Sequence, residues 1–117
     1  MNKSRIFLGL SLSILLCAQV VQAESLKNSE FLKFSEGQRH WWYSGTYTAI
    51  GHMVYLHDEK KAQCVWNWLF AEPKRKEALL IKSFKQYPDH TPTSIVIALL
   101  KRDCGELLPQ VGKSKNK

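Results

Sequence analysis

Cysteine occurs three times in the 117-residue chain, and the last two positions constrain its fold most strongly. Cys17 lies in an apolar N-terminal segment, whereas Cys64 and Cys104 lie in the remainder of the chain. In an exported protein, an even number of remaining cysteines is typical of a disulfide. A metal pair is the alternative, but no further ligands stand at the usual spacing. The sequence therefore predicts a Cys64–Cys104 bridge, which stabilises a domain too small to rely on its core alone.

The first 23 residues predict export. Lys3 and Arg5 form a positively charged n-region, and residues 6–18 form the apolar stretch that follows it. Residues 21–23 provide the small side chains that a signal peptidase requires before its cleavage site. An uncleaved anchor is the alternative, but the apolar run is short for a membrane span. A lipoprotein signal needs a small residue before the cysteine, where Leu16 stands.

These features predict three parts: a signal peptide at 1–23, a helical domain at 24–112 and a basic, disordered tail at 113–117. The expected location is the periplasm, without membrane attachment after cleavage. The mature chain carries 15 Lys and Arg against 10 Asp and Glu, a net charge of +5. Without the tail the net charge is only +2, so the basic character does not indicate nucleic-acid binding.

Start and stop signals predict an all-α bundle of about four main helices. The apolar residues of 24–34 predict a short helix that caps the core. Ser35 and Gln38 have the spacing of a capping box, which predicts a helix over about 36–57. Gly45 and Ala49 are small enough to let a neighbouring helix approach. The apolar residues at 3–4 spacing predict the inward face; they are Trp42, Thr46, Ala49, Met53 and Leu56.

Residues 62–70 match two patterns. Alternate residues from Cys64 to Phe70 are apolar, as in a strand, but other apolar residues recur with helical spacing. A helix is favoured because both flanks are helical and no second strand is present to pair with it. Asp58 and Glu59 at its start suit the helix dipole.

Prolines delimit the last two helices. Pro73 lies near the start of a helix over 74–87, and Thr91 before Pro92 is a strong signal for the next. Gly105 suits a left-handed C-cap. Residues 107–109 are expected to pack loosely. The stripe predicted to be buried in the first of these helices contains Ala78, Leu80, Ile81, Phe84 and Tyr87.

No arrangement of side chains predicts catalysis or a cofactor. His52 and His57 are five apart, so they do not align on one helix face, and HExxH and GxSxG motifs are absent. The acidic residues have the positions of caps and turns. The sequence therefore predicts a binding protein that is not an enzyme and holds no metal.

Aromatic residues are the remaining unusual feature. Trp42 fits the expected inward face, but Trp41, Tyr43 and Tyr47 cannot all do so. They either cover the edge of the core or form an interface, where Trp and Tyr are favoured anchors. The predicted partner-binding residues are Trp41, Tyr43 and Tyr47, supported by Trp66 or Trp68.

Several motifs form a series over residues 36–105: Trp42-Tyr43-Ser44-Gly45, Ala49, Cys64-Val65, Tyr87-Pro88-Asp89-His90-Thr91-Pro92, Ile95 to Leu100, and Cys104-Gly105. This series resembles the exported immunity proteins of the Tai type, also called resistance-associated proteins. That family protects bacteria from amidase effectors of type VI secretion. The resemblance implies an all-α periplasmic protein that binds a cell-wall amidase over its active site, with a homodimer as a further possibility.

An acid-stress periplasmic chaperone of the HdeA type is the alternative. Such proteins are similar in size, helical and exported, and they carry one disulfide. A basic tail and exposed aromatic residues suit the binding of unfolded clients.

Overall fold

The computed structural model describes residues 25–110, so the expected signal peptide and basic tail lie outside the described residues. Within 25–110 the chain forms five helices and no strand. The predicted all-α class with one disulfide is confirmed. The helices are α1 (Asn28–Phe31), α2 (Glu36–Tyr55), α3 (Glu59–Phe70), α4 (Pro73–Gln86) and α5 (Pro92–Cys104).

The helices begin where local signals in the sequence place them. Ser35 and Gln38 form the predicted capping box: the Ser35 hydroxyl accepts from the Gln38 amide at 3.2 Å, and the Gln38 side chain accepts from the Ser35 amide at 2.9 Å. Asp58 and Thr91 cap α3 and α5 with their side-chain oxygens. Gly105 ends α5 with φ of 83°, a backbone conformation that favours glycine.

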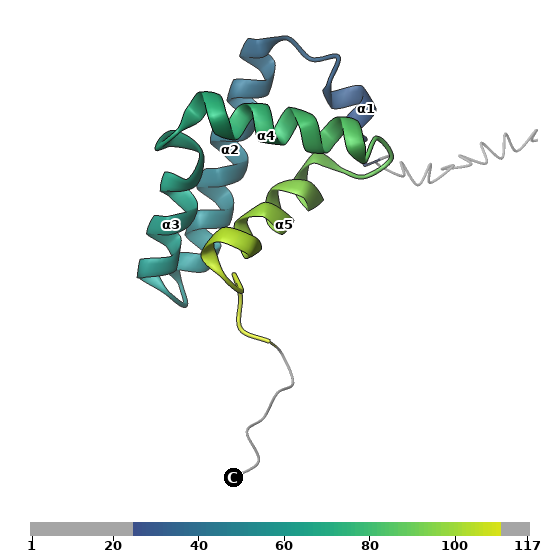
Figure 1. The fold of residues 1–117 in the computed structure, drawn as a ribbon. Coiled ribbons are helices and arrows are strands. Elements are labelled where there is room, and N and C mark those ends of the chain that lie inside the picture. The colour runs from purple at the N-terminus through teal and green to yellow at the C-terminus, as the bar shows by residue number, and fades with distance from the viewer. Residues whose placement is uncertain (1–24, 111–117) are drawn as a thin grey trace, which may run out of the picture.

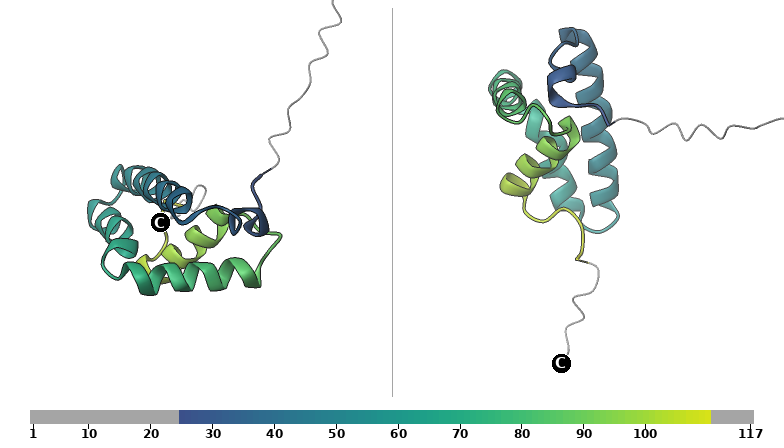
Figure 2. Two further views of the ribbon diagram at one scale, coloured as in Figure 1. Left: turned by 90° about the horizontal axis from the view of Figure 1, so that it is seen from above. Right: turned by 90° about the vertical axis from the view of Figure 1, so that its right-hand side faces the viewer.

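The long helix α2 and the antiparallel α3 lie side by side and make the most extensive helix–helix contact (Figure 1). α4 crosses one end of this pair, and α5 runs back between α4 and the pair (Figure 2). All five helices contribute side chains to one core, whose most deeply buried large residues are Tyr47, Phe31, Phe84, Leu80 and Leu100.

The buried face of α2 differs from the predicted one. The structure buries Tyr43, Tyr47, Ile50, Gly51 and Val54, so the inward stripe is shifted by one residue from the predicted series. Of the predicted residues, Trp42 and Thr46 are half-buried and the other three are exposed. The prediction failed because apolar residues are spread nearly evenly around α2, so periodicity does not distinguish its faces. Contacts with the neighbouring helices decide which face is buried.

The close approach of α3 to α2 occurs at Gly51 rather than at Gly45 and Ala49. A Cβ atom on Gly51 would overlap the Trp66 indole ring, whereas a Cβ on Gly45 would meet nothing. The absence of a side chain at Gly51 therefore makes room for Trp66.

Substitution of these two glycines should change stability in opposite directions. Gly45→Ala is expected to raise the free energy of unfolding by about 0.5–1 kcal/mol, because alanine favours the helix and the space is open. Gly51→Ala is expected to lower it by about 1–3 kcal/mol, because Trp66 must be displaced from a packed site. Urea denaturation of the two variants measures both effects, and stabilisation by Gly51→Ala would contradict the close packing.

The predicted stripe of α4 is partly confirmed. Leu80 and Phe84 are buried and Ile81 is half-buried, but Ala78 and Tyr87 are exposed. Leu107, which was expected to pack loosely, is also buried. It follows that the segment after α5 forms part of the described domain rather than a loose end.

Asn28 fixes the short helix α1 to the turn between α4 and α5. Its side-chain amide donates to the Tyr87 carbonyl at 2.7 Å, and its backbone amide donates to the His90 carbonyl at 2.7 Å. The Asn28 side chain is fully buried; its amide nitrogen has the Tyr87 carbonyl as partner, whereas its Oδ1 has none within residues 25–110. The Tyr87–Pro92 motif is therefore the point where the N-terminal segment joins the bundle.

Candidate functional site

The structure divides the five predicted partner-binding residues into two groups. Trp41 is 77% exposed and Trp66 is half-buried, whereas Tyr43, Tyr47 and Trp68 are 3%, 0% and 5% exposed. The last three are therefore core residues in this conformation, and their partner-binding role stays a prediction.

The burial of Tyr43, Tyr47 and Trp68 follows from the orientation of α2, which turns the face with Tyr43 and Tyr47 toward the core. The rings of Tyr47 and Trp68 stack at 5.8 Å between centroids with an interplanar angle of 9°, which joins α2 to α3. Tyr43 packs edge-on against Phe31 of α1 at 5.8 Å. Three large aromatic residues thus fill the space between helices instead of standing outside it.

The hydroxyl groups of Tyr43 and Tyr47 are buried and have no hydrogen-bond partner within residues 25–110. Burial raises the pKa of both hydroxyls far above the usual range, and the Glu77 carboxylate adds to the increase at Tyr43. Both groups therefore stay neutral at physiological pH. Both oxygens are enclosed by the core, so neither is open to a ligand in this conformation.

Trp41 stands beside a groove of about 420 Å³ that is bounded by the start of α2, the end of α3 and the start of α4. Phe70, which is 52% exposed, also lines the groove, together with Pro73 and His40. Tyr43 lines the same groove from the core. Two exposed aromatic side chains beside one hollow form the strongest candidate binding surface, which we call the Trp41–Phe70 groove.

The charged residues that line the Trp41–Phe70 groove are both acidic. Glu36 belongs to the first turn of α2, and Glu77 belongs to α4. The nearest cation to Glu77 is Arg39, with 3.9 Å between Arg39 Nε and Glu77 Oε1. A guanidinium hydrogen of Arg39 is already donated to the Phe34 carbonyl at 2.6 Å. The groove therefore has an acidic lining although the chain as a whole is basic.

Sequence reasoning missed three residues of this groove: Phe70, Glu36 and Glu77. Phe70 was noted only as part of a strand-like alternation, and Glu36 only through its neighbouring cap residue. No signal in the sequence connects them, because they lie on three different helices. The only indication of Phe70 in the sequence was its place at the end of the alternating apolar residues that begin at Cys64.

Trp66 belongs to a different surface. Its ring lies 5.4 Å from His52 and 6.0 Å from Tyr55, both on α2, and it covers Gly51. His52 and Tyr55 are exposed, so this cluster reaches the surface between α2 and α3. It is separate from the Trp41–Phe70 groove, since none of these residues lines that groove.

A second groove, of about 290 Å³, lies between α2, α5 and the segment that follows α5. Its exposed apolar lining residues are Met53, Ile97 and Leu108. None of the predicted partner-binding residues lines it, and it has fewer aromatic side chains than the Trp41–Phe70 groove.

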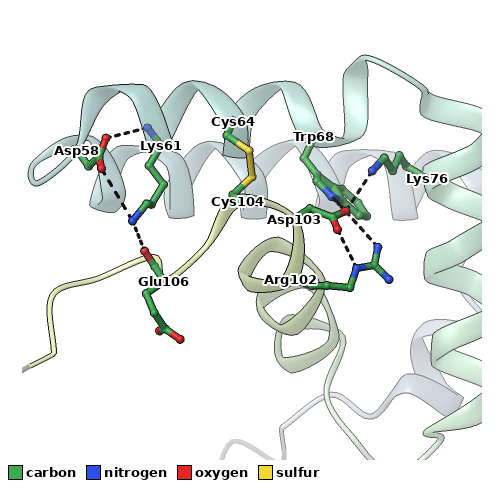
Figure 3. The surroundings of a disulfide bond; sticks show 9 residues. All are labelled: Asp58, Lys61, Cys64, Trp68, Lys76, Arg102, Asp103, Cys104 and Glu106. Carbon is green, nitrogen blue, oxygen red and sulfur yellow. Dashed lines mark hydrogen bonds and ion pairs between the residues drawn. A yellow bond between two sulfur atoms is a disulfide. The ribbon is translucent and has the colours of Figure 1, made fainter.

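The predicted disulfide joins α3 to the end of α5 and is confirmed: Cys64 and Cys104 are bonded with their Cα atoms 5.9 Å apart (Figure 3). Lys61, one turn before Cys64, donates to the Glu106 carbonyl and lies 3.9 Å from Asp58. The bridge and Lys61 together hold the segment after α5 against α3.

Asp103, the residue before Cys104, links three helices (Figure 3). Its carboxylate accepts from Arg102 Nε at 2.8 Å, from Trp68 Nε1 at 2.6 Å and from Lys76 Nζ at 3.3 Å. The Lys76 ammonium also lies 4.2 Å from the centre of the Trp68 ring. The hydrogen bond from Arg102, followed by those from Trp68 and Lys76, holds the pKa of Asp103 well below its usual range, although burial opposes the shift.

Asp103→Asn should reveal an acid-sensitive contribution to stability. A carboxylate with a lowered folded-state pKa stabilises the protein above its unfolded pKa of about 4, and this stabilisation is lost as the pH falls below that value. At pH 7 we expect the variant to lose about 1 kcal/mol, which lowers its melting temperature by about 4–8 °C. The difference between the melting temperatures of the two proteins should shrink progressively as the pH falls below about 4. A difference that stays constant with pH would contradict this role of Asp103.

The described residues do not bring metal ligands together. Within 25–110, no three His, Cys, Asp or Glu side chains form a group able to hold a metal ion. His40 lies at the Trp41–Phe70 groove, His52 lies against Trp66, and His90 lies against Tyr87 in the turn before α5. The same part of the chain has no helix with the length and apolar character needed to cross a membrane.

The fold and the groove define a small all-α domain with one disulfide and an exposed aromatic surface. No family model, curated protein or solved structure matches the chain.

Proposed function

We propose that this chain is an exported binding protein that inhibits a cell-wall amidase by occupying the entrance to its active site. The observation that carries the binding role is the Trp41–Phe70 groove, where two exposed aromatic side chains line one hollow. The amidase as partner is supported by the resemblance of the motif series to Tai-type immunity proteins.

Two features of the groove support a protein partner. Exposed tryptophan is a frequent anchor at protein interfaces, because it buries a large area with little loss of side-chain freedom. The groove is built on three helices whose relative positions are held by the Tyr47–Trp68 stack and by the core. A surface held in this way loses little conformational entropy when a partner binds.

The proposed mechanism is steric. The helical domain covers the active-site cleft of the amidase, and the peptide substrate is excluded while the complex persists. In this mechanism the inhibitor contributes no nucleophile, general base or metal to the amidase. Inhibition then follows from affinity alone.

Trp41→Ala tests the binding role. Hot-spot residues contribute about 2 kcal/mol or more on truncation, so we expect the affinity for the partner amidase to fall about 30-fold. The melting temperature should change little, because Trp41 is largely outside the core. Calorimetric titration of a secreted amidase encoded beside this protein measures the first quantity, and thermal denaturation measures the second.

Leu56→Ala is the matched control, because Leu56 is an exposed apolar residue at the other end of the same helix and does not line the groove. Its affinity for the amidase should equal that of the wild type. Equal affinities of the Trp41→Ala and Leu56→Ala variants would contradict the assignment of the groove as the binding surface.

The acid-stress chaperone is a second candidate, and the Asp103 cluster favours it. As the pH falls below about 4, the unfolded chain takes up a proton at Asp103 that the folded chain does not, so the stability contributed by its links to α3, α4 and Arg102 is progressively lost. This function predicts that the protein suppresses aggregation of unrelated denatured proteins below about pH 4 but not at pH 7. Inhibition of the amidase at pH 7 without such activity would favour the first proposal.

A further inference from the structure

We propose that the Trp41–Phe70 groove receives an arginine side chain of the partner protein. This inference rests on the proposed function, since it specifies the chemistry of the partner at the same surface. It is carried by two properties of the groove that a guanidinium group matches at the same time: acidic groups and exposed aromatic rings.

The first property is charge. The groove is lined by two carboxylates, Glu36 and Glu77, and by no lysine or arginine. Glu36 makes no ion pair within residues 25–110, and the only ion pair of Glu77 there is the 3.9 Å contact with Arg39. Because the mature chain has an excess of basic residues, this acidic lining is a local feature of the groove. It selects a cation.

The second property is aromatic surface. The faces of tryptophan and phenylalanine rings attract cations, and arginine also stacks on such rings through its planar group. The protein already uses this interaction internally, where the Lys76 ammonium lies 4.2 Å from the centre of the Trp68 ring. In the groove, the exposed rings of Trp41 and Phe70 have no cation in such a position within the described part of the chain.

A guanidinium carries five N–H donors in a planar fork, which binds a carboxylate with two parallel hydrogen bonds while its plane stacks on an aromatic ring. An ammonium group offers a single point of charge, so the geometry favours arginine over lysine.

The test uses the ¹⁵N-labelled mature chain and the peptide acetyl-Gly-Arg-Gly-amide as the probe. The indole N–H resonance of Trp41, assigned from the Trp41→Phe spectrum, should shift and saturate with this peptide. The same peptide with citrulline, the neutral isostere of arginine, should bind at least about fivefold more weakly. A lysine peptide should bind with intermediate affinity.

Glu36→Gln and Glu77→Gln should each weaken binding of the arginine peptide by up to about fivefold, because each removes a charge while keeping the shape. Glu72→Gln is the matched control, since Glu72 is an exposed carboxylate near the start of α4 that does not line the groove. Its affinity should not change. Because Glu36 is exposed, its variant keeps the test valid even if Glu77→Gln affects folding.

Equal binding of the arginine and citrulline peptides, or an unchanged affinity in both groove variants, would overturn the inference. Its failure is distinguishable from failure of the proposed function. If Trp41→Ala weakens amidase binding while both glutamate variants bind it normally, the groove is the interface but does not receive arginine. If the arginine peptide binds as expected and Trp41→Ala leaves amidase binding unchanged, the groove recognises arginine but the proposed function is wrong.

Discussion

Phe31→Ala is expected to lower the free energy of unfolding by about 3–5 kcal/mol, the largest effect of any single substitution considered for this protein. Phe31 is the last residue of the four-residue helix α1, and its side chain is fully buried. Its ring lies 4.8–5.8 Å from four other aromatic rings, those of Phe34, Trp42, Tyr43 and Phe84.

The size of the effect follows from this environment. Truncation removes apolar area from the core and leaves a cavity among rigid rings that cannot easily close around it. A helix of four residues has little stability of its own, so α1 depends on this contact and on Asn28 to stay in place. Because domains of this size are stable by only about 5–15 kcal/mol, the variant should be close to unfolding at physiological temperature.

Urea denaturation measures the change, and Phe70→Ala is the matched control. It makes the same truncation at a half-exposed position, so its effect on stability should be within about 0.5 kcal/mol. Similar losses in the two variants would contradict the central position of Phe31 in the core.

Removal of the disulfide by the double substitution Cys64→Ala and Cys104→Ala is expected to cost about 2–5 kcal/mol of stability. The two residues are 40 positions apart, and closing a loop of that length stabilises by about 4 kcal/mol in the chain-entropy model. The bond also holds α5 against α3 at the point where Asp103 and Lys61 make their contacts.

Reduction provides the control for this prediction. The wild type with a reducing agent should unfold at nearly the same urea concentration as the double variant, and the agent should not change the variant. Thiol titration of residues 24–117, expressed alone and denatured without reduction, should find no free thiol. Two free thiols, or equal stability of the oxidised wild type and the variant, would contradict the structural role of the bridge.

The sequence alone determined where most of the helices begin and end, and which cysteines pair. Ser35 with Gln38, Asp58, Thr91 and Gly105 act on backbone groups within a few residues, so their effect is visible in the sequence. The disulfide followed from the count of cysteines expected to remain after export. These features depend on local chemistry or on a simple count, and the structure confirms both the helices and the bridge.

Only the tertiary structure decided which face of α2 is buried, and with it the location of the candidate site. Because apolar residues are spread nearly evenly around α2, its faces do not differ until α1 and α3 pack against it. That packing buries Tyr43 and Tyr47, leaves Trp41 exposed, and brings Phe70 and Glu77 from two other helices to the same groove. The groove depends on contacts between residues distant in the sequence, and such contacts leave no local signal.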